Sequence, residues 1–498
     1  MTETISRLST GVDGLDDVLN GGYLEGDAYL IRGDPGTGKT LLGLHFLQAG
    51  VEDDESVLCV NLEESEAKIR RHAKSVGFDL DGIGFLDLSP SSDAFTTSDY
   101  DVFGPDEVEQ ETVKETIADR IDERQPTRVL VDPVTRLRHL FADDHQFRKN
   151  VVGFVDYLEQ QGGTVLFTTQ NLASEPDDDL QYLGDGTLDL THDLRSRSLT
   201  VPKFRGSDVQ SGKHGVTIQA GGMTVFPELR PESHVREFTK ETISSGVPEL
   251  DSLLNGGIER GTITVVSGPT GVGKTTLGAQ FMKSAASRGE RSVIYMFEER
   301  RETFYERSEA VNIPITEMVD HHQLNVEEVE ALNQSAEAFS TQVQREVEEE
   351  GASIVMIDGI DGYRLSLRGE DDILTQKLHA LCRYLKNMGV TVVLVDEVSQ
   401  ITGEFRATNA GISYLADNIV FLRHLERHGE MQKAIGVLKK RTSDYERQLR
   451  EFRITSNGIV VGKSLSGLRG VLTGTPEEVA DHDRGAIETV YRGATDGE

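Results

Sequence analysis

The sequence predicts two tandem α/β domains, each with a mostly parallel sheet flanked by helices and a C-terminal antiparallel hairpin. Two observations lead to this fold class: a Gly-rich loop occurs twice, and short apolar strands alternate with helical stretches in both halves. Lys39 and Lys274, which occupy the same place in the two loops, are 235 positions apart (274 − 39). Upstream residues repeat at the same offset: Gly11, Leu15, Asp16, Asn20, Gly21 and Gly22 recur as Gly246, Leu250, Asp251, Asn255, Gly256 and Gly257. This common register indicates a duplicated domain.

The individual elements follow the same repeat. Apolar runs predict strands at 28–32, 57–62, 128–131 and 165–168 in the first copy, and at 263–267, 293–297, 354–357 and 390–395 in the second. Alternating segments around the turn pairs at 221–222 and 457–458 predict the hairpins. The segment 327–350 has apolar residues at helical spacing and is expected to be a surface helix on the sheet. The domains are therefore expected at 1–230 and 231–475, followed by an acidic tail at 476–498.

The composition limits the compartment and the partners. The net charge is −34, with 85 acidic against 51 basic residues. Because a nucleic-acid-binding protein needs clustered cations to neutralise backbone phosphates, nucleic acid is not the expected partner. The same acidity suits a cytoplasm with concentrated salt, where self-repulsion is screened.

Cys59 and Cys382 lack metal-ligand spacing and are expected to be core residues. With neither a secretion signal nor a membrane-length apolar run, we expect a soluble, cytoplasmic protein.

Each Gly-rich loop lies between an apolar strand and an amphipathic helix, as phosphate-binding loops do. Glycines allow consecutive backbone N–H groups to face phosphate oxygens, and the helix presents its positive end. Lys39 and Lys274 are expected to reach the β and γ phosphates of ATP, and Thr40 and Thr275 to bind Mg²⁺. The expected nucleotide-binding residues are Gly33, Asp34, Pro35, Gly36, Thr37, Gly38, Lys39 and Thr40, and Gly268, Pro269, Thr270, Gly271, Val272, Gly273, Lys274 and Thr275.

Paired acids follow the next strand of each copy, Glu63 with Glu64 and Glu298 with Glu299. The carboxyl end of a parallel strand lies beside such a loop, where a carboxylate can polarise the water that attacks the γ phosphorus. The alternative is that these acids only complement the dipole of the following helix. Because the pair is repeated, we expect at least one member of each to be catalytic.

Two further features accompany each loop. Asp132 and Asp358 end apolar strands and are expected to hold Mg²⁺ directly or through water, the alternative being a capped strand-to-helix turn. A late strand carries alternating cations, Lys203 and Arg205 in the first copy and Lys439 and Arg441 in the second, whose period of two places both on one face. These cations could instead protect a solvated edge strand.

Together these motifs resemble the KaiC branch of the RecA-like ATPases, in the double-domain form, with a haloarchaeal-type composition. The resemblance extends from 9–16 through 411–419 to 472–476. It implies that ATP and Mg²⁺ lie between subunits of a homo-oligomeric ring, usually a hexamer. The loop and the Glu pair would come from one subunit and the Lys-x-Arg strand from its neighbour, so that Lys203, Arg205, Lys439 and Arg441 act on the neighbour's nucleotide.

The resemblance also implies serine/threonine autokinase activity in the second domain. KaiC phosphorylates an adjacent Ser-Thr pair, and the matching residues here are Ser413 and Tyr414, which leaves Ser413 as a single candidate phosphosite. The sequence therefore favours a ring-forming ATPase that signals to protein partners. A recombinase-like or helicase-like motor on DNA is one alternative, which the lack of a basic, aromatic surface pattern disfavours. A nucleotide-gated scaffold is another, disfavoured because both copies retain the full residue set.

Overall fold

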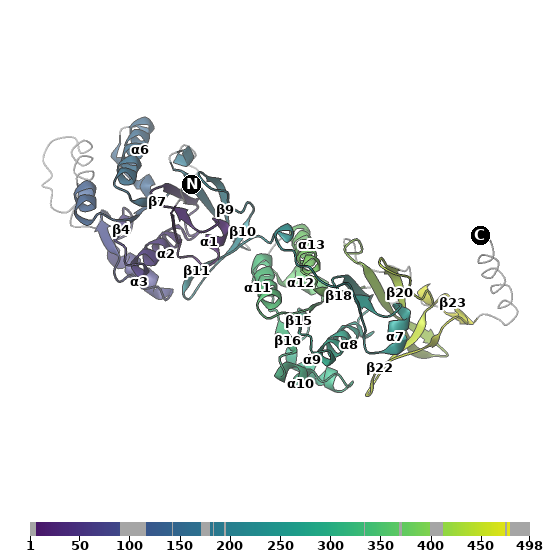
Figure 1. The fold of residues 1–498 in the computed structure, drawn as a ribbon. Helices are drawn as coiled ribbons and strands as arrows, with labels where there is room; N and C mark the ends of the chain where they lie inside the picture. Colours follow the sequence, from purple (N-terminus) through teal and green to yellow (C-terminus); the bar gives the residue numbers. More distant parts are fainter. Residues whose placement is uncertain are drawn as a thin grey trace. The chain divides into compact units, whose positions relative to one another are not determined.

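The computed structural model describes residues 6–89, 116–141, 143–170, 180–182, 184–193, 196–332, 334–367, 371–398, 412–473 and 476–478. The chain forms two compact units, which divide between Glu228 and Leu229 (Figure 1). Most of the expected acidic tail, 479–498, lies outside the described residues. Within the described part of the chain, no helix has the length and apolar character needed to cross a bilayer.

The first unit is a nine-stranded sheet of order β11-β10-β9-β8-β3-β7-β6-β4-β5. Its parallel strands are β3 (Ala28–Gly33), β4 (Val57–Asn61), β5 (Gly84–Asp87), β6 (Arg128–Asp132), β7 (Thr164–Thr168) and β8 (Gly186–His192). The antiparallel continuation is β9 (Arg197–Phe204), β10 (His214–Gln219) and β11 (Gly222–Phe226). Strands β1 (Arg7–Leu8) and β2 (Tyr23–Leu24) pair separately. The described helices are α1 (Leu15–Val18), α2 (Lys39–Glu52), α3 (Glu66–Ser75) and α6 (Asp144–Gln160).

The second unit repeats this plan with a sheet of order β16-β15-β17-β18-β14-β19-β20-β21-β22. Its parallel strands are β14 (Ile263–Gly268), β15 (Ser292–Met296), β16 (Leu324–Glu328), β17 (Ile354–Asp358), β18 (Thr391–Glu397) and β19 (Asn418–Arg427). Antiparallel strands are β20 (Glu430–Lys440), β21 (Arg450–Thr455) and β22 (Gly458–Ser464), with short pairs β12 (Thr242–Ile243) and β13 (Ile258–Glu259), and β23 (Leu468–Arg469) and β24 (Glu477–Glu478). Helices are α7 (Pro248–Leu253), α8 (Lys274–Ser287), α9 (Arg301–Glu309), α10 (Ile315–Asp320), α11 (Ala336–Glu348), α12 (Ile360–Ser366) and α13 (Asp371–Asn387).

Each sheet is covered on both faces because its central strands are apolar on both sides. In β3, Ile31 packs with α2 and α3, whereas Leu30 packs with α6, as the period-two alternation of a strand requires. Figure 1 shows the same three layers in each unit: strands lie between α6 and the α2–α3 pair, and between α11–α13 and α8–α10. Cys59 and Cys382 are buried, unpaired core residues. The predicted fold class is confirmed, including both terminal hairpins, β10–β11 and β21–β22.

The prediction of one helix over 327–350 is wrong at its beginning. Residues 327–328 end strand β16, which pairs with β15, and helix α11 starts only at Ala336. The physical reason is a local cap: the Ser335 side chain accepts a hydrogen bond from the Ala338 N–H at 3.2 Å, which fixes the N-terminus. From that point the predicted apolar face, Phe339 and Val343, is buried against the sheet.

Candidate nucleotide sites

The first Gly-rich loop joins β3 to α2 and is shaped by left-handed glycines. Gly36 has a φ of 82° with open space beside it, and Gly38, at 110°, stands at the N-terminus of α2 without a side-chain cap. The helix therefore presents uncapped backbone N–H groups at its positive end, which is where an anion binds. The Lys39 side chain is buried, and its Nζ donates to the carbonyls of Gly33 at 2.7 Å and Asp34 at 2.9 Å.

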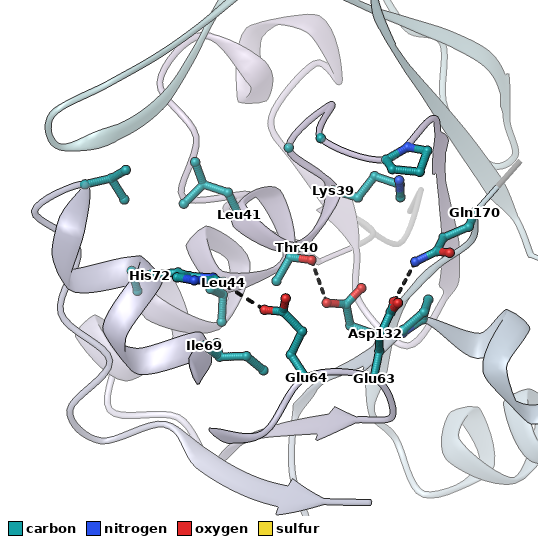
Figure 2. Close-up of a pocket in the computed structure, with 16 residues that line it drawn as sticks. Lys39, Thr40, Leu41, Leu44, Glu63, Glu64, Ile69, His72, Asp132 and Gln170 are labelled. Carbon is teal, nitrogen blue, oxygen red and sulfur yellow. Dashed lines mark hydrogen bonds and ion pairs between the residues drawn. The ribbon is translucent and has the colours of Figure 1, made fainter. Parts of the chain in front are cut away.

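Behind this loop, Asp132 at the end of β6 accepts hydrogen bonds from two hydroxyl groups. Thr40 Oγ1 donates to Oδ2 at 2.6 Å (Figure 2). Thr168 Oγ1 donates to Oδ1. Burial raises the pKa of Asp132, against the opposing effect of these hydrogen bonds and of Lys39. A buried carboxylate beside a threonine hydroxyl is an oxygen donor set that suits Mg²⁺, and a bound cation would offset the cost of burying the charge.

Glu63 and Glu64 face different parts of the first site (Figure 2). Glu63 receives a hydrogen bond from Gln170 Nε2 at 2.6 Å and pairs with Arg136 at 2.6 Å. Glu64 instead lies toward α3, where its carboxylate is 2.5 Å from Lys68 Nζ and 3.5 Å from His72 Nδ1. The charge of Glu63 adds to the effect of burial in raising the pKa of Asp132. Glu63 is thus the member of the pair that lies near Asp132, the expected Mg²⁺ ligand.

These groups line a cavity of about 450 Å³, a size suited to a small-molecule ligand. One part of it is polar: the loop, Thr40, the Glu pair, Asp132 and Gln170. The other part is apolar and lies between α2 and α3, with the lining residues Leu41, Leu44, Ile69, Ala73 and Val76. Sequence reasoning did not identify Gln170, Arg136, Thr168 or this apolar wall. Gln170 could have been found by the criterion that found Asp132, a polar side chain just beyond an apolar parallel strand.

The second loop repeats the geometry of the first between β14 and α8. Gly271 has a φ of 70° in open space, and Gly273, at 112°, begins α8 without a side-chain cap. Lys274 is buried and donates to the Pro269 carbonyl at 3.0 Å. Its Nζ also lies 3.5 Å from Glu397 Oε2, at the end of β18, a contact for which sequence reasoning gave no expectation.

The carboxylates of the second site are also arranged as in the first. Thr275 Oγ1 donates to Asp358 Oδ1 at 3.0 Å, and burial raises the pKa of Asp358 to about 7. Burial, and next the charge of Glu397, raise the pKa of Glu298. Glu299 pairs with Arg307 of α9 at 2.7 Å. In both sites, therefore, the first acid faces the loop and the second pairs with a cation of the following helix.

The alternating cations do not join the phosphate loop of their own unit. Lys203 of β9 lies opposite Thr187 of β8. Thr187 is in turn level with Leu30 of β3, three residues before Gly33. The Nζ of Lys203 donates to the carbonyls of Gln181 and Gly184, the first at 3.2 Å, while Arg205 lies 3.4 Å from Asp185. The matching residues of the second unit are Lys439 and Arg441.

In the second unit the equivalent cations, Lys439 and Arg441, bond to the segment around Ser413. Lys439 Nζ donates to the Ser413 carbonyl at 2.9 Å, and Arg441 donates to the Tyr414 carbonyl at 3.1 Å. Ser413 and Tyr414 are exposed. The candidate phosphosite and the second pair of cations therefore lie together, bonded through backbone carbonyls, and Arg441 also lies 3.7 Å from the Asp417 carboxylate.

Two copies of a loop that begins a helix, each with a threonine bonded to a strand-terminal aspartate, define a tandem P-loop ATPase of the RecA-like type. The chain belongs to the KaiC family of ATPases, whose family model matches residues 8–230 and 243–466. Relatives named "Circadian clock oscillator protein KaiC" align over nearly the full length. Those of Parasynechococcus marenigrum and Synechococcus elongatus are each 27% identical, covering 99% of this chain and 97% and 96% of theirs. That of Prochlorococcus marinus MIT 9313 is 28% identical, covering 96% and 97%.

Proposed function

We propose that the chain is a regulatory ATPase that assembles with copies of itself into a ring, expected to be a hexamer. The first units form one tier of the ring and the second units the other, with a nucleotide between each pair of neighbours in both tiers. The observation that carries this proposal is the separation of groups: each unit has a complete loop, threonine, aspartate and Glu set, yet its Lys-x-Arg cations bond elsewhere. A neighbouring copy could supply the missing positive charge.

In this mechanism the residues of one subunit bind the nucleotide and prepare water. Lys39 and Lys274 hold the β and γ phosphates of ATP, displacing their present backbone carbonyl contacts. Thr40 with Asp132, and Thr275 with Asp358, would hold Mg²⁺, which would neutralise phosphate charge when bound. The first acids, Glu63 and Glu298, orient and polarise a water molecule. The water oxygen bonds to the γ phosphorus and loses a proton by way of the Glu carboxylate, as the bond from the γ phosphorus to the β–γ bridging oxygen breaks. The products are ADP, phosphate and a proton.

The output of such a ring would be a nucleotide-dependent shape read by protein partners in the cytoplasm. The acidic charge of −34 supports protein rather than nucleic-acid partners, and it also supports a salt-rich cytoplasm as the working medium. The second unit would in addition be a serine autokinase, because the exposed Ser413 lies beside the cations of that unit.

The oligomeric state tests this proposal most directly. We expect the mass in solution, measured by light scattering in high-salt buffer, to rise to that of a closed ring when ATP and Mg²⁺ are added. Asp132→Asn with Asp358→Asn should weaken this response, since both Mg²⁺ carboxylates lose their charge. A mass that stays monomeric with saturating ATP would contradict the inter-subunit role of the cations. Stimulation of ATPase by single-stranded DNA at matched ionic strength would favour a DNA motor instead.

Autophosphorylation has its own test. After incubation with γ-labelled ATP, we expect label on Ser413, absent from Ser413→Ala and from Lys274→Ala, because the first lacks the acceptor and the second the donor site. Ser443→Ala is the matched control, since it removes a hydroxyl from the same unit and should keep the label. Label that persists in Ser413→Ala, or that maps to another residue, would remove Ser413 as the acceptor.

A further inference from the structure

Among the differences between the two sites is one outside the loops, at a position whose equivalence the register of the sheets identifies. In the second unit, Glu397 of β18 is level with Gly268, the first residue of the loop. In the first unit, Ile31 is level with Thr168, so that continuing this register by two residues places Gln170 level with Gly33. Gly33 and Gly268 are themselves equivalent in the repeat. Gln170 and Glu397 therefore occupy the same place beside the two phosphate loops.

The two side chains have different partners. The Gln170 amide donates to Glu63 at 2.6 Å, and Lys39 Nζ donates to the carbonyls of Gly33 and Asp34. Glu397 instead lies 3.5 Å from the Nζ of Lys274, whose side chain is 8% exposed, while its own side chain is 40% exposed. Where the first site has a neutral amide, the second has a negative charge against its phosphate-binding lysine.

That charge has two consequences for an incoming nucleotide. The Glu397 carboxylate attracts the ammonium group of Lys274 and so weakens the attraction of that group for phosphate oxygens. It also stands with Glu298 at the same edge of the site, where burial, and next the charge of Glu397, raise the pKa of Glu298. A further terminal phosphate, with its additional negative charge, must therefore enter a more repulsive field in the second site than in the first.

We propose that Glu397 determines nucleotide preference at the second site, by making binding of a nucleoside triphosphate less favourable relative to the diphosphate, and that Gln170 leaves the first site without this bias. The inference rests on the proposed function, since it takes both loops to be nucleotide sites. At a given ratio of ATP to ADP, the two tiers would therefore hold different fractions of ATP. The second tier would exchange ADP for ATP when the ADP concentration falls, whereas the first would already be filled with ATP.

The test measures binding to the second site of the full chain, with the first site silenced by Lys39→Ala. Mg²⁺ complexes of ADP and of a non-hydrolysable ATP analogue are titrated by calorimetry. Glu397→Gln should tighten the analogue about tenfold and ADP by clearly less, as removal of one nearby charge predicts. Glu317→Gln, the same charge change on the exposed surface of α10, should alter neither. An equal change for both nucleotides, or none, would overturn the proposal.

The reciprocal exchange guards against an effect of misfolding. In a chain silenced at the second site by Lys274→Ala, Gln170→Glu should weaken the analogue at the first site more than ADP. Unchanged preference in this variant would also overturn the proposal. Failure of the proposed function is distinguishable, because neither nucleotide would then bind the parent chains with Lys39→Ala or Lys274→Ala alone.

Discussion

Replacing both acids of the first site, Glu63→Gln with Glu64→Gln, is expected to lower its ATPase rate at least about a hundredfold, because no carboxylate remains to polarise the attacking water. The measurement is phosphate release at saturating ATP in high-salt buffer, in a chain whose second site carries Lys274→Ala. Amides keep the size of the side chains, and nucleotide binding should therefore be largely retained, so the loss should appear in kcat rather than KM.

The single variants assign this effect to one acid. Glu63→Gln should account for most of it, since Glu63 is bonded to Gln170 at 2.6 Å beside the Mg²⁺-type carboxylate. Glu64→Gln should cost less, because Glu64 pairs with Lys68 of the following helix. Glu66→Gln, a carboxylate bonded to Arg70 on that helix, is the matched control and should leave the rate near its parent value. A double variant with an unchanged rate would show that the pair only complements the helix.

The parts of each site that a contiguous motif defines could be predicted from the sequence. The Thr40–Asp132 hydrogen bond is an example: both residues stand at strand or helix boundaries that apolar patterning fixes, and parallel strands bring those boundaries to one edge. The mostly parallel character of each sheet and the two hairpins also follow from strand–helix alternation and turn residues. These features are local in sequence or imposed by the fold class.

The place of Gln170 beyond an apolar strand could be predicted, but the partners of individual side chains could not. Gln170 and Glu397 follow their strands as polar residues often do, and only the register of β7 and β18 with the loop strands shows that they are equivalent. Their different partners, Glu63 and Lys274, depend on side-chain reach rather than spacing. The error at 327–350 has a similar origin, since Val329 and Leu332, which lie between β16 and α11, continue the apolar period of the helix.

The alternating cations give the second large expected effect, because a finger that stabilises transition-state charge is worth roughly a thousandfold or more in rate. With the second site silenced by Lys274→Ala, Arg205→Ala should reduce ATPase of the first tier strongly. Lys213→Ala, which removes an exposed cation paired with Asp193 in the same unit, is the control and should not. Arg205 bonds within its own subunit to Asp185, which lies away from the loop, so the loss by itself does not say whose nucleotide is affected.

Mixing two inactive variants answers that question. Arg205→Ala subunits keep an intact loop, and Lys39→Ala subunits keep an intact cation. If each site joins the loop of one subunit to the cation of its neighbour, a random ring made from equal amounts restores about a quarter of the sites, and thus about a quarter of the rate. Subunits carrying both changes should add nothing when mixed with either. A site built within one subunit would leave every mixture inactive, because neither variant alone holds both groups, and the shared-site geometry would then be wrong.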